Sequence, residues 1–367
     1  MQRFLALSCL VGCLLAAALV FPREHQAVAA PTPTSTSTPA NRSRADMPPR
    51  KVIIGTAVQG FWGPYPGLEK RLALLREIVE EIGAQAEKKY HGRGLDLVVI
   101  PENAVTSGRA AQAADRAVPF TGTVRDTFVE LARRYKTYLV VTLDLAEPDG
   151  KTYSNAAILL DRTGKEVGIY RKVHPVAVLG QDQLEGGITP GREFPVFNCD
   201  FGKLGIQICY DMVYDDGWAE LARKGAEVVV WPSASPAKAQ PASRARQNGY
   251  YLISSTFRDN STFFEPTGMV AAQVRPPDRV LVQEIDLSYA VLPWSSDLGN
   301  GQAFKEKYGD RAGFRYYEAE DLGIFWSNDP TTPIHQMVRE LGLAEIGPDV
   351  ERNRQIQDSA RGGAPGK

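Results

Sequence analysis

The chain has 367 residues and a nearly balanced charge, with 42 Lys and Arg against 43 Asp and Glu and a formal net charge of -1 at pH 7. This balance, without a long basic run, gives no electrostatic footprint for binding nucleic acid. The few cysteines and histidines show no metal-ligand spacing, and no serine-hydrolase or dinucleotide-binding motif is present. We therefore expect no cofactor.

Residues 1–29 are predicted to be an export signal. A short basic start precedes the apolar run Phe4–Phe21, and Ala27-Val28-Ala29 fits the small-x-small rule of signal peptidase. An uncleaved N-terminal anchor is the alternative, because the run is near the lower length limit for a span. A lipoprotein site ending at Cys13 is disfavoured, because the chain stays apolar after it. In each case the protein is exported: periplasmic, secreted or membrane-anchored outside the cytoplasm.

The next segments differ in composition. Residues 30–49 are rich in Pro, Thr and Ser and predict a disordered linker, and residues 349–367 predict a flexible tail. Between them lie about 300 residues, enough for one large domain. We place this domain at 50–293. Residues 294–348 are aromatic-rich, end in a predicted helix over 332–341, and are interpreted as a C-terminal extension packed on the domain.

Strand-like and helix-like periodicities alternate along the domain. Apolar residues spaced by three and four predict amphipathic helices, and short apolar or alternating runs predict strands. Strands are predicted at 51–58, 97–100, 138–143, 156–160, 166–170, 204–209, 228–231, 251–256 and 280–286, and helices at 68–86, 128–135, 218–223 and 241–249. This order indicates an α/β domain with helices covering a mixed sheet system.

Two cysteines, Cys199 and Cys209, follow the predicted signal. A disulfide would be the default in an exported protein. The segments VFNC and LGIQIC flank the turn DFGK, so a hairpin would place Cys199 near Leu204 or Gly205. Cys209 would then lie about 13 to 16 Å further along its strand, beyond the roughly 7 Å Cα limit for a disulfide. Cys209 is therefore expected to be a free thiol.

Cys209 is a candidate nucleophile. Leu204, Ile206 and Ile208 alternate with it, so Cys209 faces away from the apolar side and lies where the predicted strand stops. A single cysteine is more often an inert core residue. A nucleophile needs thiolate character, which a nearby lysine ammonium could supply.

Lys172 and Glu102 are candidate partners of this thiol. Lys172 lies in YRKVHP, where a surface lysine would be ordinary, and Glu102 follows LVVIP, where a loop carboxylate would be ordinary. A fixed ammonium would stabilise the thiolate and an oxyanion. A carboxylate at the mouth of an apolar sheet is partly desolvated, which raises its pKa toward that of a general base. The adjacent Arg171 is assigned to a structural ion pair.

Glu185, in QLEGGITPG, is a weaker fourth candidate that could hold the lysine and the leaving group in place, although a loop glutamate needs no function. His174 is an alternative partner, because Cys/His pairs are common nucleophiles. Glu102, Lys172 and Cys209, in chain order within one globular region, predict a cysteine hydrolase of carbon-nitrogen bonds.

Six segments then resemble the signature segments of the nitrilase (carbon-nitrogen hydrolase) superfamily. They are VVIPEN, YSNAAILLDRTGKEVGIYRKVHP, PGREFPVFNCDFGKLGIQICYD, VVVWPSAS, RARQNGYYLISS and FFEPTGMVAA. The resemblance covers about Lys51 to Asp286. It implies that residues 50–293 form a carbon-nitrogen hydrolase domain with a four-layer α-β-β-α sandwich of the nitrilase type. It also implies a homodimer or higher homo-oligomer built across a twofold interface.

The resemblance also implies residue roles. Glu102 would be the general base, Lys172 the oxyanion stabiliser, Cys209 the nucleophile, Glu185 an auxiliary glutamate, the backbone N–H of Tyr210 an oxyanion donor, and Ser233 and Ala234 substrate contacts. Cys209-Tyr210-Asp211 is similar to the amidase and carbamoylase branches, whereas true nitrilases usually show Trp then Glu.

The sequence therefore predicts an exported enzyme that cleaves a non-peptide C–N bond of a small linear amide or N-carbamoyl compound, through a thioester on Cys209, releasing ammonia or an amine. The alternatives are a nitrile hydrolase, or a catalytically silent exported binding or scaffold protein on the same fold. We expect a small-molecule substrate, no nucleic acid and a membrane tether through the N-terminus if the signal is retained. A recessed pocket is expected, roofed by residues 314–317 or by Phe325 and Trp326.

Overall fold

The computed structural model describes residues 47–177, 180 and 182–362. The predicted signal at 1–29 and most of the predicted linker at 30–49 lie outside these ranges. None of the helices within them combines the length and the apolar character needed to cross a bilayer.

The first sheet has six strands in the order β12-β1-β2-β3-β4-β5. Their bounds are β1 (Lys51–Ala57), β2 (Leu97–Val99), β3 (Tyr138–Ala146), β4 (Tyr153–Leu160), β5 (Glu166–Arg171) and β12 (Val280–Asp286). Strands β1, β2 and β3 are parallel to one another, and the remaining pairs are antiparallel. All six strands were expected from the sequence.

The second sheet also has six strands, in the order β11-β10-β9-β8-β7-β6. Their bounds are β6 (Val196–Cys199), β7 (Gly202–Ile206), β8 (Val228–Ser233), β9 (Tyr251–Thr256), β10 (Ser261–Phe264) and β11 (Val270–Val274). Strands β7, β8 and β9 are parallel. In both sheets a parallel centre therefore presents the carboxyl ends of neighbouring strands at a common edge.

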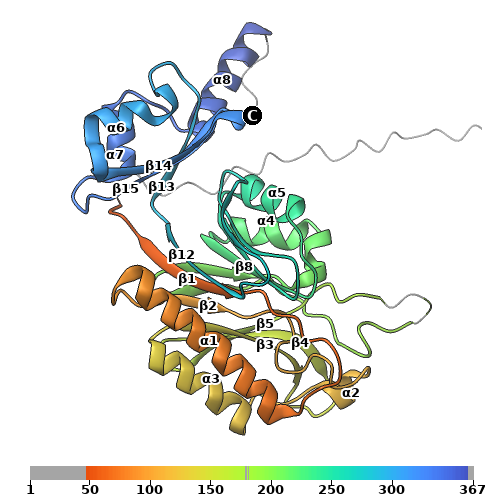
Figure 1. Cartoon of the computed structure of the whole chain (residues 1–367). Coiled ribbons are helices and arrows are strands. Elements are labelled where there is room, and N and C mark those ends of the chain that lie inside the picture. The colour runs from red at the N-terminus through yellow and green to blue at the C-terminus, as the bar shows by residue number, and fades with distance from the viewer. Residues whose placement is uncertain (1–46, 178–179, 181, 363–367) are drawn as a thin grey trace, which may run out of the picture. The chain divides into compact units, whose positions relative to one another are not determined.

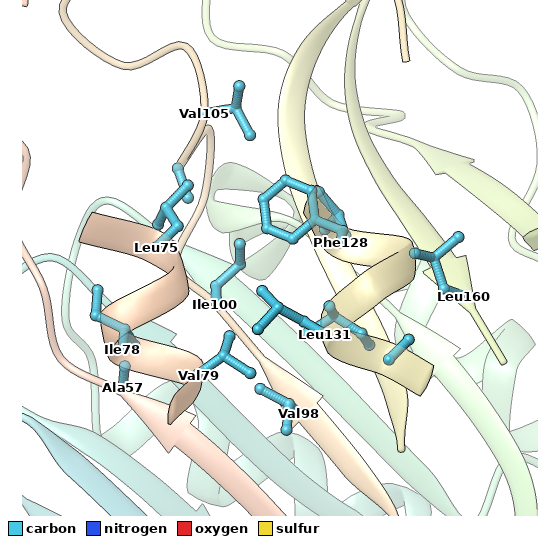
Figure 2. Packing of buried hydrophobic residues seen from close by; sticks show 14 of the residues in the cluster. Ala57, Leu75, Ile78, Val79, Val98, Ile100, Val105, Phe128, Leu131 and Leu160 are labelled. Atoms are coloured by element: carbon cyan, nitrogen blue, oxygen red, sulfur yellow. The ribbon is translucent and has the colours of Figure 1, made fainter. Parts of the chain in front are cut away.

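Helices cover the outer face of each sheet. Helices α1 (Leu68–Tyr90) and α3 (Gly122–Tyr135) pack on the first sheet, and α4 (Asp216–Arg223) and α5 (Ala239–Asn248) pack on the second (Figure 1). Figure 2 shows Leu75 and Val79 of α1 facing Leu131 and Phe128 of α3, with Ile100 between the two helices and Val98 below them. This apolar stripe is the one that the spacing predicts.

The inner faces of the two sheets form a separate apolar layer. Ile54 and Val99 of the first sheet belong to one buried cluster with Ile206, Val230 and Ile253 of the second. Because strands alternate sides, the neighbouring residues of the first sheet face the helices instead. The layers therefore run helix, sheet, sheet, helix, which is the expected α-β-β-α sandwich.

The C-terminal extension is a small unit with its own core. Strands β13 (Tyr289–Pro293), β15 (Leu322–Ser327) and β14 (Ala312–Tyr317) form a three-stranded sheet, and α6 (Gln302–Tyr308) and α7 (Ile334–Glu340) pack on it. Helix α7 matches the predicted helix at 332–341. Strand β13 belongs to this sheet, so the structural unit begins before the predicted boundary at 293/294.

The described part of the predicted tail at 349–367 is mostly helical. Helix α8 (Ile346–Ala360) includes most of the described part of this segment, although it buries none of its residues. Ion pairs one turn apart, Arg352 with Asp349 and Arg361 with Asp358, stabilise it locally. The other short elements are α2 (Ala113–Arg116) and the 3₁₀ turns η2 (Cys209–Val213), η3 (Gly299–Gly301), η4 (Gly309–Arg311) and η5 (Glu318–Glu320).

The hairpin that carries the two cysteines is tighter than predicted. Cys199 pairs with Gly202, and strand β7 ends at Ile206 rather than continuing to Cys209. The predicted pairing of Cys199 with Leu204 or Gly205 is therefore wrong, because the connection is a short turn rather than a longer loop. The tighter register moves Cys199 further from Cys209 along the strand, and both cysteines are free.

Candidate active site

The candidate residues converge at the carboxyl edge of the two sheets. Glu102 follows β2, Lys172 follows β5, Cys209 lies just beyond β7, and Ser233 ends β8. Side chains that follow neighbouring parallel strands meet at one edge, which is where α/β proteins commonly build their sites. The structure therefore brings together residues that are far apart in the chain.

Lys172 is the central cation. Its side chain is 1% exposed, and its Nζ lies 2.9 Å from Glu102 Oε1 and 2.6 Å from Glu185 Oε1. Burial alone would lower the lysine pKa, but the charges of Glu102 and Glu185 outweigh burial and raise this pKa well above its ordinary value. Lys172 is therefore held as an ammonium.

Glu102 is held as a carboxylate by three donors. Its Oε1 accepts from Lys172 Nζ and from Asn155 Nδ2 at 2.8 Å, and its Oε2 accepts from the backbone N–H of Ala234 at 2.9 Å. Burial raises the pKa of Glu102, but the charge of Lys172 and these hydrogen bonds lower the pKa below its usual range. The sequence-based expectation of a raised pKa is wrong, because it counted burial and not the donors.

Glu185 completes the group around the lysine. Its Oε1 also accepts from the backbone N–H of Val176 at 3.0 Å, and its Oε2 accepts from Asn155 Nδ2 at 3.1 Å. The residue has a positive φ of 42°. Arg116 fixes its backbone, donating from Nη2 to the Glu185 carbonyl at 2.9 Å while its guanidinium pairs with buried Asp144.

Cys209 begins the turn η2 in a strained conformation. Its φ of 42° is in the left-handed region, which a side chain with a Cβ rarely adopts. Two hydrogen bonds hold the turn: Trp231 Nε1 donates to the Cys209 carbonyl at 3.0 Å, and the backbone N–H of Ile208 donates to Asp211 Oδ2 at 2.8 Å. The side chains of Ser233 and Glu102 both influence the pKa of the thiol.

The Cys209 thiol is protonated in this arrangement. Burial first, and then the negative charge of Glu102, raise the pKa of the thiol to about 12, although Lys172 and Ser233 act in the opposite direction. The lysine ammonium favours the thiolate, as expected, but burial and the carboxylate outweigh its effect on the thiol pKa. Glu102, held ionised beside the thiol, is placed to accept its proton.

His174 and Arg171 lie outside this group. His174 Nδ1 lies 3.0 Å from Asp211 Oδ1 and its ring stacks on Tyr214 at 4.0 Å, and its hydrogen bond to Asp211 raises the histidine pKa. Arg171 forms the expected structural ion pair, at 2.6 Å from Glu147. His174 therefore interacts with Asp211 of η2 and not with the Cys209 thiol.

Ala234 contacts Glu102 directly, whereas Ser233 forms a hydrogen bond within its own loop. The Ala234 N–H binds Glu102, and Ser233 Oγ donates to the carbonyl of Ser235 at 2.7 Å. Asn155 was missed by the sequence reading, although it is a buried polar residue inside the apolar strand YSNAAILL. A polar residue in an otherwise apolar strand is the sequence feature from which Asn155 could have been found. Within the described ranges, no three His, Cys, Asp or Glu side chains cluster as metal ligands.

The predicted aromatic roof is at the other end of the sheets. Lys51, which begins β1, lies 5.5 Å from the ring of Trp326 and bonds Asn328 of the extension. Strand β1 is parallel to β2, whose carboxyl end leads to Glu102. The segment 314–317 and the pair Phe325 and Trp326 are therefore at the amino end of β1, away from the thiol, and do not cover it.

Comparison with known proteins identifies the family. The profile of the family described as carbon-nitrogen hydrolase matches residues 56–292. The chain is 27% identical to an omega-amidase, NIT2-A, of Xenopus laevis over 223 residues, covering 55% of this chain and 80% of that protein. It is 26% identical to a deaminated glutathione amidase of Synechocystis over 220 residues, covering 53% and 80%.

Solved structures show the same fold. The structure of Saccharomyces cerevisiae Nit3, a member of branch 10 of the nitrilase superfamily, superposes with a TM-score of 0.56 at 23% identity, covering 65% of this chain and 90% of that chain. The match to the family profile spans more than half of the present chain. The protein belongs to the carbon-nitrogen hydrolase family of the nitrilase superfamily.

Proposed function

We propose that this carbon-nitrogen hydrolase cleaves a small linear amide or N-carbamoyl compound through a thioester on Cys209. The observation that carries the proposal is the buried contact of Lys172 with both Glu102 and Glu185 beside the Cys209 thiol. This arrangement offers a nucleophile, a base and a fixed cation in one place, which is what acyl transfer needs.

The first half of the proposed reaction forms the thioester. Glu102 takes the thiol proton as Cys209 Sγ attacks the carbonyl carbon, and the resulting oxyanion is stabilised by Lys172 Nζ and the backbone N–H of Tyr210. When the tetrahedral intermediate collapses, the C–N bond breaks and Glu102 returns the proton to the leaving nitrogen. Ammonia or an amine leaves, and the acyl group remains on sulfur.

The second half consumes water. Glu102 accepts a proton from the water that attacks the thioester carbon, and the same oxyanion donors stabilise the second intermediate. The C–S bond then breaks, the thiol regains the proton, and the acid leaves. Lys172 does not need to change its protonation during the cycle, because Glu102 and Glu185 keep its pKa high. Glu185 serves to hold the ammonium in place.

An amide or carbamoyl substrate is favoured over a nitrile by Cys209-Tyr210-Asp211, which is similar to the amidase and carbamoylase branches. The two curated relatives reported above are themselves named as amidases. A nitrile remains the alternative substrate class.

An ammonia-release screen over matched amides, ureido compounds and nitriles tests the proposal. We expect turnover in the amide or ureido arm, an acyl adduct on Cys209 by mass spectrometry, and neither with Cys209→Ala. Turnover of nitriles alone would show that the substrate is a nitrile and not an amide or a carbamoyl compound. No turnover by reduced, folded protein would favour a silent binding or scaffold protein.

We further propose that the enzyme is exported by residues 1–29 and assembles as a homodimer or higher homo-oligomer. The sequence of the N-terminal segment supports export, and membership of the superfamily supports assembly. N-terminal sequencing of protein from its native host tests export, since an intact Met1 in a cytoplasmic fraction would refute it. Light scattering of the purified protein tests assembly.

A further inference from the structure

Arg116 ends the short helix α2, and its guanidinium is held on every side. Its side chain is 12% exposed. A guanidinium carries five N–H donors in a rigid planar fork. Here the donors have acceptors on one carboxylate and three carbonyls: Asp144 at 2.8 and 3.1 Å, Ala110 at 3.1 Å, Ala111 at 2.6 Å and Glu185 at 2.9 Å. A side chain bound in this way keeps one position and fixes the backbone that it contacts.

Asp144 anchors this guanidinium in the sheet. It lies on β3 and is fully buried, and its Oδ2 also accepts from the Thr106 hydroxyl at 2.7 Å. Thr106 belongs to the loop that follows Glu102. Burial raises the pKa of Asp144, and the hydrogen bond and charge of Arg116 act against that rise. The buried carboxylate therefore depends on Arg116 for its charge.

The loop that carries Glu185 is docked on the segment that Arg116 holds. The backbone N–H of Ala113 donates to the carbonyl of Gly186 at 2.7 Å. A Cβ on Gly186 would lie 2.2 Å from the carbonyl oxygen of Ala111, so the two segments touch where only glycine fits. Arg116 binds both sides of this contact, because it donates to the carbonyls of Ala111 and Glu185.

Through Glu185 this contact reaches the catalytic lysine. Glu185 has a positive φ of 42°, and a backbone in this region persists only where its surroundings determine it. Its Oε1 lies 2.6 Å from Lys172 Nζ. Asp144 is paired across the sheet with Asn155, whose Nδ2 donates to Glu185 Oε2 at 3.1 Å. The pair Arg116 and Asp144 therefore orients the backbone of the glutamate whose carboxylate Asn155 orients.

We propose that Arg116, anchored by Asp144, is a positioning residue of the reaction. It holds the backbone of Glu185 so that the glutamate carboxylate keeps the Lys172 ammonium directed at the oxyanion. The inference rests on the proposed function of the same site and adds a residue that acts on it from outside. Because a slight misplacement of catalytic groups can cost about a hundredfold in rate, loss of Arg116 should lower kcat and leave KM nearly unchanged.

Arg116→Lys separates positioning from stability. It keeps a cation beside Asp144 but lacks the fork that reaches Asp144 and Glu185 together. We expect this variant to keep most of the melting temperature of the wild type and to lower kcat by about tenfold to a hundredfold. An unchanged kcat in Arg116→Lys would overturn the proposal.

Arg116→Ala tests the same point by chemical rescue. This variant should also lose kcat, and guanidinium ion added well below its denaturing concentration should restore part of the loss, because the space that Arg116 leaves reaches solvent. The wild type and Glu185→Ala should gain nothing from the ion. Equal gains in all three proteins would contradict a role of the Arg116 guanidinium.

Arg162→Lys is the matched control. Arg162 also pairs with carboxylates, of Asp96 and Asp200, but Asp96 immediately precedes β2 and so lies at the amino end of that strand, away from Glu102. This variant should lower the melting temperature and leave kcat unchanged. An equal loss of kcat in Arg162→Lys and Arg116→Lys would mean that the loss reflects general loosening, and would overturn the proposal.

A double-mutant cycle tests whether Arg116 acts through Glu185. Glu185→Ala keeps the backbone carbonyl that Arg116 binds and removes the carboxylate that holds Lys172. In the Glu185→Ala background, Arg116→Lys should cause almost no further loss of kcat, because coupled residues do not have additive effects. Losses that multiply would show that Arg116 acts by another route.

Hydrogen exchange separates this inference from the proposed function, because it needs no turnover. The backbone N–H of Glu185 donates to the carbonyl of Val176 at 3.0 Å and that of Ala113 to Gly186. Peptides that contain these amides should exchange faster in Arg116→Lys than in the wild type, and at the wild-type rate in Arg162→Lys. This result would support the positioning of Glu185 even if the amide panel showed no turnover. Unchanged exchange in Arg116→Lys would contradict it whatever the substrate.

Discussion

Cys209 combines a strained backbone with a protonated thiol, and both follow from its neighbours. The turn places it in the left-handed region, and burial beside Glu102 raises the pKa of the thiol to about 12. A nucleophile in this state depends on a base during attack, not on a standing thiolate. The pair Cys209 and Glu102 should therefore act as one unit.

We predict that Cys209→Ala and Cys209→Ser each lower turnover by at least about a thousandfold, because loss of either member of a catalytic unit removes the whole unit. The far-ultraviolet circular dichroism should be unchanged. Cys199→Ser should retain nearly full activity, because Cys199 is at the opposite end of the β6–β7 hairpin. If Cys199→Ser lowered turnover as much as the Cys209 variants do, Cys209 could not be assigned as the nucleophile.

Asn155 sets the pKa of the base as well as its position. Its Nδ2 bridges Glu102 and Glu185, so Asn155→Leu removes one donor from each carboxylate. Because that donor helps to depress the pKa of Glu102, its loss should raise this pKa. The activity that requires ionised Glu102 is lost as pH falls through the folded-state pKa, so the acid limb of kcat/KM should move to higher pH.

A pH-rate profile of Asn155→Leu measures this shift, with Asn155→Asp as a second variant that adds a carboxylate instead of removing a donor. The depressed pKa of Glu102 affects the stability of the fold in the same direction as it affects activity. A depressed pKa stabilises the fold above the unfolded value of about 4.3, and this contribution is lost as pH falls through the folded pKa. An acid limb that stays in place would show that Asn155 acts only through packing.

Alanine substitutions of Lys172 and His174 should have different effects on the reaction. Lys172→Ala removes the cation that neutralises two carboxylates and stabilises the oxyanion, so no acyl adduct should form on Cys209. His174→Ala should keep most of the activity, because its ring binds Asp211 rather than the thiol. Mass spectrometry after brief exposure to substrate measures the adduct. Loss of the adduct in folded His174→Ala would make histidine the base.

At the level of elements, the sequence predicted what is local and missed what is long-range. The stripe Leu72, Leu75 and Val79 and the apolar run Leu97–Val99 carry their own period, so α1 and β2 were predicted closely. Apolar alternation continues through Ile208, whereas the strand β7 ends at Ile206, because pairing with a neighbour, not alternation, defines its end.

In the active site, too, the sequence predicted the local features and missed the long-range contacts. Glu102, Lys172 and Cys209 were predicted because each lies in a distinctive segment at a strand end. The hydrogen bonds of Asn155 to the two glutamates and the arginine that fixes Glu185 depend on contacts between distant parts of the chain. The direction of the Glu102 pKa shift was missed for that reason, since three-dimensional contacts determine it.

The extension is attached to the domain through an ion pair whose carboxylate is buried. Glu265, which follows β10 and is fully buried, binds Arg315 and accepts from the Tyr317 hydroxyl at 2.8 Å. Removing one partner of such a pair leaves an uncompensated charge. Arg315→Met should therefore lower the free energy of unfolding by about 3 kcal/mol, and Glu265→Gln in the same background should recover part of the loss.

Urea unfolding of the two variants measures this coupling, and kcat is the internal control. Since the extension contacts the amino end of β1, catalysis at the carboxyl end should continue in the folded fraction. A large loss of kcat in folded Arg315→Met would mean that the extension also acts on the site.

For the whole molecule, the protonation of Cys209 is suited to the oxidising compartment that we propose for it. Oxidation of cysteine proceeds through the thiolate, and an ordinary thiol with a pKa of about 8.5 is a few per cent ionised at pH 7. A thiol whose pKa is raised to about 12 is ionised far less. The enzyme can therefore keep a reactive nucleophile without a standing thiolate, provided that Glu102 removes the proton only during attack on substrate.

We therefore predict that hydrogen peroxide inactivates the enzyme at least about tenfold more slowly than it oxidises free cysteine at pH 7, on the basis of the thiolate requirement. Removing the charge of the base with Glu102→Gln lowers the thiol pKa, so this variant should gain a sulfenic acid on Cys209 faster even though it cannot turn over. Dimedone labelling followed by mass spectrometry measures both rates, with Cys209→Ser as the blank. Faster labelling of the wild type than of Glu102→Gln would show that the carboxylate activates the resting thiol, and the thiolate would then be the resting form.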